Sequence, residues 1–271
     1  IEGVSKETAK SAAKSHQNPI QRVMTLLAEI FTPIIPAIIV GGLILGFRNV
    51  IDQVQWGFLD GQTIAQHSQF WSGISSFLWL PGEAIFQFLP VGIVWSVSRK
   101  MGTSQILGIV LGICLVSPQL LNAYNVASTP AAEIAKKWVW DFGFFTVRRI
   151  GYQGQVIPAL LAGLSLSYLE IFWRKKIPEV VSMIFVPFLS LIPAMILAHT
   201  VLGPIGWTIG QWISTIVYAG LTGPVKWLFG AIFGALYAPF VITGLHHMTN
   251  AIDTQLVADT GGTGLWPMIA L

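Results

Sequence analysis

Long apolar stretches alternate with short polar ones along most of this chain. The first covers residues 23–50 and is interrupted by Pro33 and Pro36; others lie near 74–97, 104–121, 150–173, 180–203 and 225–243. A helix needs about 20 mostly apolar residues to cross a hydrocarbon core of about 30 Å. The pattern therefore predicts an all-α, polytopic transmembrane helical bundle.

Two segments differ from plain spans. Residues 205–221 carry several aromatic and amide side chains (Trp207, Gln211, Trp212 and Tyr218), which predicts a helix at the membrane interface. Residues 244–271 mix polar groups with glycines and a proline. Irregular backbone at membrane depth must be buried in protein or line a cavity, so this range predicts a re-entrant hairpin.

Composition supports a membrane protein. Of the 271 residues, 54% are hydrophobic and only 10% are charged, against about 25% charged in a soluble domain. This excludes a soluble enzyme and a disordered chain. The net charge of +3 is too small to indicate nucleic acid as a partner. A single cysteine, Cys114, excludes an internal disulfide and a cysteine-built metal site. We expect neither a metal nor another cofactor.

Loop charges predict the orientation. With the N-terminus inside, nine basic residues are cytoplasmic (Lys6, Lys10, Lys14, Arg22, Arg99, Lys100, Arg174, Lys175 and Lys176) and five are outside (Arg48, Lys136, Lys137, Arg148 and Arg149). Basic residues concentrate in cytoplasmic loops, so the count favours a cytoplasmic N-terminus. The basic loop 122–149 argues against it unless that loop contacts protein or ligand.

The strongest candidate site directly follows a predicted span and holds His246, His247 and Asp253. Neutral imidazole both donates and accepts hydrogen bonds, which suits a polyhydroxylated ligand. The two adjacent histidines diverge by about 100° on a helix, so only one can face a given ligand. They lack the i, i+4 spacing of a helical zinc site. The alternative is a pair of interfacial histidines without a ligand.

Polar groups in two other apolar segments are further candidates. Glu83 lies within a predicted span, where it is either a ligand contact, one side of a gating ion pair with Arg48, Arg148 or Arg149, or part of a structural pair. Arg148 precedes a Gly-Tyr-Gln-Gly-Gln run, in which Gln153 can hydrogen-bond the hydroxyl groups of a ligand. The alternative is that this whole cluster anchors the chain at the membrane interface.

We assign His199, near a span end, a structural role. The Gly261–Gly264 run lacks the Gly-Lys-Ser/Thr of a phosphate-binding loop, which argues against a nucleotide site.

Three stretches resemble the membrane-embedded IIC component of the bacterial sugar phosphotransferase system, glucose superfamily. They are the opening span with Pro33, Pro36 and the residues 41–46, the segment 151–158 (GYQGQVIP), and residues 244–253 (GLHHMTNAID). The last two, with the flanking WDFG and WP motifs, are most similar to the trehalose branch, and next to the sucrose branch.

The resemblance implies a homodimeric permease in the bacterial cytoplasmic (inner) membrane, embedded in its lipid, that binds a disaccharide, trehalose or sucrose. It implies that His246 contacts the sugar, and that an EIIB domain, charged by an EIIA phosphocarrier, transfers a phosphoryl group from its phosphocysteine to a sugar hydroxyl. That cysteine motif is absent, since Cys114 lies in an apolar segment. We expect the sugar-binding glutamate of the family's Thr-Glu-Pro motif to lie beyond Leu271.

Together these observations predict three regions: a cytoplasmic amphipathic linker (1–22), an N-terminal transmembrane bundle that forms the dimer contact (23–221), and the start of the sugar-binding domain (222–271). The predicted function is disaccharide translocation coupled to phosphorylation. A proton-coupled secondary transporter using Glu83 or Asp253 is the alternative, and a membrane scaffold or sensor is a third class.

Overall fold

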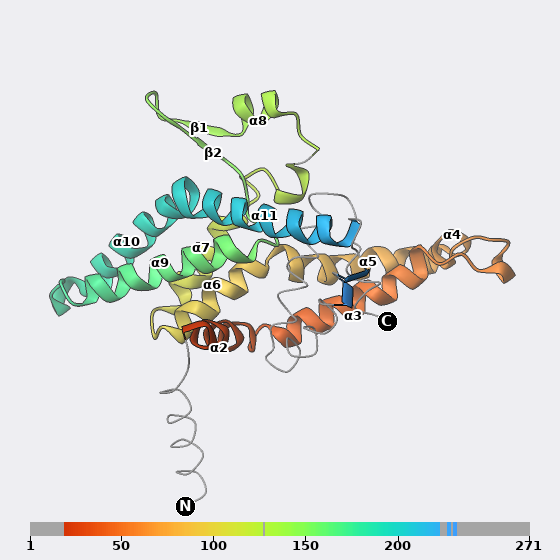
Figure 1. Ribbon diagram of the computed structural model, residues 1–271, viewed down its shortest axis with the longest axis horizontal. Helices are drawn as coiled ribbons and strands as arrows, with labels where there is room; N and C mark the ends of the chain where they lie inside the picture. Colours follow the sequence, from red (N-terminus) through yellow and green to blue (C-terminus); the bar gives the residue numbers. More distant parts are fainter. Residues whose placement is uncertain (1–18, 127, 223–226, 229, 232–271) are drawn as a thin grey trace, which may run out of the picture.

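The computed structural model describes residues 19–231, apart from 127, 223–226 and 229. Most of the predicted linker, the predicted hairpin at 244–271 and the candidate residues His246, His247 and Asp253 lie outside the described residues. The described part is a bundle of helices with one small β-hairpin on its side (Figure 1).

The first predicted span is two helices rather than one. Helix α2 covers Pro19–Phe31 and α3 covers Ile35–Asp52, with a turn at 32–34 between them. Proline has no N–H to donate and its ring clashes with the preceding helical turn. Pro33 therefore lies in the turn, whereas Pro36 fits the first turn of α3. In the polar region that follows, the chain forms η1 (Gly57–Leu59) and α4 (Ile64–His67).

The span predicted near 74–97 is broken. Helix α5 (Gln69–Gln87) and α6 (Leu89–Lys100) meet at Phe88 with a bend of 45°. Pro90 lies in the first turn of α6, where its missing N–H is tolerated. Pro81 remains inside α5 without ending it. The break brings polar groups of α5 to the end of a helix within an apolar segment.

The span predicted at 104–121 is shorter than expected, because α7 covers only Gln105–Leu115. The chain then forms η2 (Ala123–Asn125), α8 (Ala131–Lys137) and a hairpin of β1 (Val139–Asp141) and β2 (Thr146–Arg148). The strands are antiparallel, and Trp140 lies opposite Val147. The sequence did not predict this hairpin. Its tip turns at Gly143, which has a positive φ of 84° and donates its N–H to Asp141 Oδ1 at 2.8 Å.

Two predicted spans are confirmed as α9 (Val156–Arg174) and α10 (Glu179–Leu197). Helix α10 continues through the π-helical turn η3 (Ala198–Leu202) into α11 (Gly203–Thr222), the segment predicted as an interfacial helix. Among the described residues, three helical stretches are long and apolar enough to cross a membrane, or four if the bent α5–α6 pair counts as one. These stretches confirm the predicted helical membrane protein.

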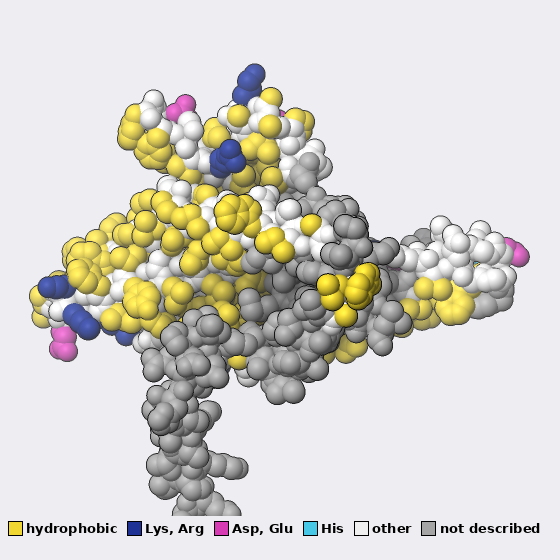
Figure 2. Space-filling view, in the orientation of Figure 1, with side chains coloured by type: hydrophobic (Ala, Val, Ile, Leu, Met, Phe, Trp, Pro, Cys, Tyr) yellow, Lys and Arg dark blue, Asp and Glu magenta, His cyan; other side chains and the backbone are white. Residues whose placement is uncertain are grey.

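Helix α6 lies at the centre of the bundle and packs against α7 and α9. Ile93, Val94 and Val97 of α6 are fully buried. Small residues let the neighbouring backbones approach closely, as is typical of membrane helices: a Cβ on Gly112 of α7 would stand 2.5 Å from Val91 Cα. Hydrophobic side chains instead cover the outer surface of α10 and α11 (Figure 2), and Met183 there is 90% exposed.

Candidate functional site at the α5–α6 break

Two polar side chains face each other one helical turn apart at the end of α5. Gln87 Nε2 donates a hydrogen bond to Glu83 Oε1, and both residues are half-buried. Residues four apart are neighbours on a helix surface. The pair lies directly before the break at Phe88, so the carboxylate and the amide are held at the point where the helix changes direction.

A phenol from a distant part of the chain lies near the same end of α5. Tyr124 belongs to η2, where the side chain of Asn122 accepts a hydrogen bond from the Tyr124 N–H at 3.0 Å. Burial, together with the negative charge of Glu83, raises the pKa of Tyr124 to about 12. The phenol lies near the end of α5, because the Tyr124 hydroxyl and the Phe86 carbonyl oxygen both lie within 4 Å of the same point beside Gly154. Glu83, Gln87 and Tyr124 form what we call the helix-break cluster.

Gly154 provides the surface against which Tyr124 rests. A Cβ on Gly154 would overlap the Tyr124 hydroxyl and would stand 3.9 Å from the Phe86 carbonyl oxygen. The φ of Gly154 is +70°, a conformation that other residues rarely adopt. The loop at residues 151–155 therefore reaches the end of α5 and meets the phenol there.

Gln153, a predicted site residue, holds this arrangement in place. Its side chain is buried; Oε1 accepts a hydrogen bond from the Ala123 N–H at 2.9 Å, and Nε2 donates to the Val116 carbonyl at 3.3 Å. Backbone hydrogen bonds at 2.8 Å, between Leu121 and both Arg149 and Gly151, fix the same loops. The amide of Gln153 is thus engaged within the protein, and it positions the segment that carries Tyr124.

The ion pair with an arginine, one of the alternatives predicted for Glu83, is not formed among the described residues. Arg48 pairs with Asp52 at 2.8 Å instead, while Arg149 donates to the Gln119 carbonyl at 2.8 Å. Arg148 is exposed on β2. The partner of Glu83 is Gln87 because the i, i+4 spacing brings the two together on one helix.

The helix-break cluster has the chemistry of a site for a neutral, hydroxylated ligand. A carboxylate accepts hydrogen bonds, while an amide and a phenol both donate and accept them. Within the part of the chain that the structure describes, no group of three or more His, Cys, Asp or Glu residues could hold a metal ion. Sequence reasoning found Glu83 and Gln153 but missed Gln87 and Tyr124. The i, i+4 spacing of Gln87 from Glu83 was the available signal.

Comparison with known proteins identifies the family. The family described as "Phosphotransferase system, EIIC" matches residues 28–270. The chain belongs to this EIIC family. Its relatives include the "PTS system trehalose-specific EIIBC component" of Escherichia coli (strain K12), which is 48% identical over 99% of this chain and 55% of the relative. No solved structure matches the chain.

Other relatives of this EIIC chain carry two sugar names. The trehalose-specific EIIBC component of Bacillus subtilis (strain 168) is 37% identical over 98% of this chain and 56% of the relative. The sucrose-specific EIIBC component of Staphylococcus xylosus is 36% identical over 100% of this chain and 56% of the relative. The chain thus spans about half the length of these curated relatives. The predicted resemblance to the trehalose and sucrose branches is confirmed, and the proton-coupled alternative is not favoured.

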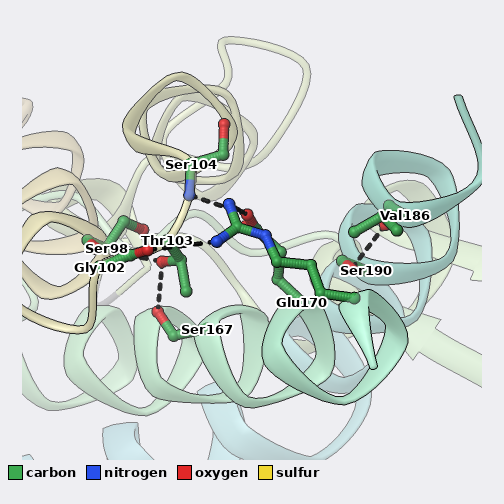
Figure 3. A network of polar contacts seen from close by, with 9 residues as sticks. Ser98, Gly102, Thr103, Ser104, Ser167, Glu170, Val186 and Ser190 are labelled. Atoms are coloured by element: carbon green, nitrogen blue, oxygen red, sulfur yellow. Dashed lines mark hydrogen bonds and ion pairs between the residues drawn. The ribbon is translucent and has the colours of Figure 1, made fainter. Parts of the chain in front are cut away.

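A second polar network in this EIIC chain lies at one end of the bundle (Figure 3). Glu170 of α9 is 1% exposed, and its Oε1 accepts hydrogen bonds from the Ser104 N–H at 2.9 Å and from Arg174 Nη2 at 2.5 Å. Arg174 also donates to the Gly102 carbonyl at 3.3 Å. Ser167 and Thr103 share a further hydrogen bond of 3.2 Å. The network fixes the turn between α6 and α7 against α9, and sequence reasoning missed it.

Proposed function

We propose that this chain is the membrane-spanning part of a phosphotransferase-system permease that binds a disaccharide, trehalose. The permease translocates the sugar while an EIIB phosphocysteine phosphorylates it. Membership of the EIIC family along nearly the whole chain carries the proposal. The 48% identity to a protein named for trehalose supports that sugar over sucrose.

The helix-break cluster supports a hydroxylated substrate. Ionisable groups in membrane segments are costly and mark substrate or ion pathways, and Glu83 has only a neutral partner, Gln87, among the described residues. We infer that Glu83 and Tyr124 line the sugar path where it passes the α5–α6 break. His246, with His247 and Asp253 beside it, contributes from the following segment. Arg148 remains a candidate contact at the hairpin, and Gln153 is a positioning residue.

We further propose that the chain works as a homodimer with a cytoplasmic N-terminus. Residues 1–22 form the linker, 23–221 the dimer scaffold and 222–271 the start of the sugar-binding domain. The basic ends of α6 and α9 lie together, since Arg174 reaches Gly102, whereas α3, the helix that carries Arg48, ends on the opposite side of the bundle (Figure 1). This arrangement agrees with a cytoplasmic face that carries Arg99, Lys100 and Arg174.

Uptake of labelled trehalose by cells or vesicles carrying the intact protein tests the mechanism. We expect the label to accumulate as sugar phosphate, and uptake to stop when the EIIA phosphocarrier is deleted. Unchanged uptake without the phosphocarrier would refute phosphorylation-coupled transport. His246→Ala should weaken sugar binding by roughly 1–3 kcal/mol if one buried hydrogen bond is lost, and binding equal to wild type would remove His246 from the site.

A further inference from the structure

The joint between α10 and α11 is the least regular point of the long helical run Glu179–Trp212. The turn η3 is π-helical, and π-helical turns interrupt the regular hydrogen-bond ladder and often mark functional sites. Pro187 and Pro193 lie inside α10 before the joint, while Gly203 and Pro204 follow it. Local weakening on both sides makes η3 the natural place for the two helices to pivot.

His199 is buried in this joint, at the contact between α10, the hairpin and the loop at 151–155. The residue is 7% exposed, and its ring lies 5.5 Å from that of Trp140 of the hairpin and 5.6 Å from that of Tyr152. The backbone of Cys114 approaches the imidazole, but Nδ1 has no hydrogen-bond partner among the described residues. A buried polar atom without a partner destabilises the conformation that contains it. A conformation in which Nδ1 gains a partner is free of this cost.

Contacts lead from this joint to the helix-break cluster. A Cβ on Gly203 would overlap the Tyr152 hydroxyl, so the start of α11 packs flush against that phenol. Tyr152 lies in the loop at 151–155, where the Gln155 N–H donates to the Tyr152 carbonyl at 3.0 Å. Gly154 of the same loop supports Tyr124. A shift of α11 relative to α10 therefore displaces Tyr152, and through the loop at 151–155 it reaches Gly154 and Tyr124.

We propose that η3 is a joint of the transport cycle at which His199 Nδ1 gains a hydrogen-bond partner, and that Tyr152 transmits its movement to the loop beside Tyr124. His199 and Tyr152 are then positioning residues, which act on the sugar through Gly154 and Tyr124. This proposal adds to the predicted structural role of His199 a role that differs between conformations.

Movement at the joint can be measured without sugar, so this test is independent of the proposed function. Spin labels at Met183→Cys on α10 and Ile216→Cys on α11, in a Cys114→Ser background, report the distance across η3 in the intact protein in nanodiscs; both side chains are exposed. We expect two distance populations, with a ratio that shifts in His199→Phe. A single distance that His199→Phe leaves unchanged would overturn the proposal.

A pair of conservative variants separates hydrogen bonding at Nδ1 from packing. The amide of Asn can occupy the position of Nδ1, whereas the amide of Gln occupies that of Nε2. We expect His199→Phe and His199→Gln to slow sugar translocation by about 10-fold, the value of roughly one hydrogen bond, with little change in equilibrium sugar binding. His199→Asn should restore most of the rate. Equal rates for the Asn and Gln variants, or a wild-type rate for His199→Phe, would contradict a hydrogen bond that Nδ1 gains during transport.

Discussion

The contact between Gly154 and Tyr124 can be tested by a double-mutant cycle. Gly154→Ala adds a methyl group in a backbone conformation with φ of +70° and places it against the Tyr124 hydroxyl. The conformation costs about 1–2 kcal/mol for a residue with a Cβ, and the overlap adds about 1–3 kcal/mol. Tyr124→Phe removes the overlapping oxygen and leaves the ring carbon Cζ at 3.3 Å, a tight but tolerated contact.

The matched control is Gly143→Ala at the hairpin tip. Gly143 has a similar φ of 84°, but nothing lies within 4 Å of its Cβ position, so its substitution measures backbone strain alone. The assay is the free energy of unfolding of the purified protein in mixed micelles. We expect Gly154→Ala to cost about 2–5 kcal/mol in the wild-type background, and about as much as Gly143→Ala once Tyr124→Phe is present.

The interaction energy of the cycle is therefore expected to be about 1–3 kcal/mol. If Gly154→Ala costs the same in the wild-type background and in the Tyr124→Phe background, the phenol does not rest on Gly154. The link between the loop at 151–155 and the helix-break cluster would then be refuted.

Three further predictions concern packing, burial and titration. Gly112→Ala should destabilise the protein by about 1–2 kcal/mol despite the better helix propensity of alanine, because the new Cβ would stand 2.5 Å from the α6 backbone. In the control Gly42→Ala nothing lies within 4 Å of the new Cβ, so thermal unfolding should show a neutral or stabilising effect. Gln153→Leu leaves the Ala123 N–H and the Val116 carbonyl unpaired and should cost about 2 kcal/mol or more, while the exposed Gln119→Leu should change unfolding little. Tyr124 loses its proton near pH 10 in the unfolded chain and near pH 12 in the folded protein, so the free energy of unfolding should fall as the pH rises through that window. Tyr124→Phe should reduce this dependence of stability on pH. An unchanged dependence would place the phenol in water.

Long apolar helices were predictable from the sequence because their length alone distinguishes them. Helices α9 and α10 occupy almost the ranges that their apolar runs indicated. The effect of a proline was harder to foresee: Pro33 lies in a turn, whereas Pro81 stays within α5. Whether a proline ends a helix depends on neighbours that satisfy the freed carbonyl, and those neighbours come from tertiary packing.

The candidate site was predictable only in part, because its contacts join distant segments. Glu83 stood out as a carboxylate in an apolar run, but the approach of Tyr124 to the end of α5 depends on contacts of two distant loops, at Tyr124 and Gly154. The strands β1 and β2 have three residues each, too few to show an alternating pattern. Gln153 was singled out as an amide that can hydrogen-bond hydroxyl groups, but its burial and its two hydrogen bonds to the backbone of other loops could not be read from local sequence.

Equilibrium binding of trehalose to the intact protein, measured by calorimetry, shows whether the sugar binds at the α5–α6 break. Glu83→Gln keeps the shape of the side chain and removes its charge, and Glu133→Gln does the same at a more exposed carboxylate on α8. We expect Glu83→Gln to weaken binding by about 10-fold or more, the effect of losing a hydrogen bond to a charged group, and Glu133→Gln to leave it unchanged. Equal affinity for wild type and Glu83→Gln would contradict the placement of the sugar path at the α5–α6 break.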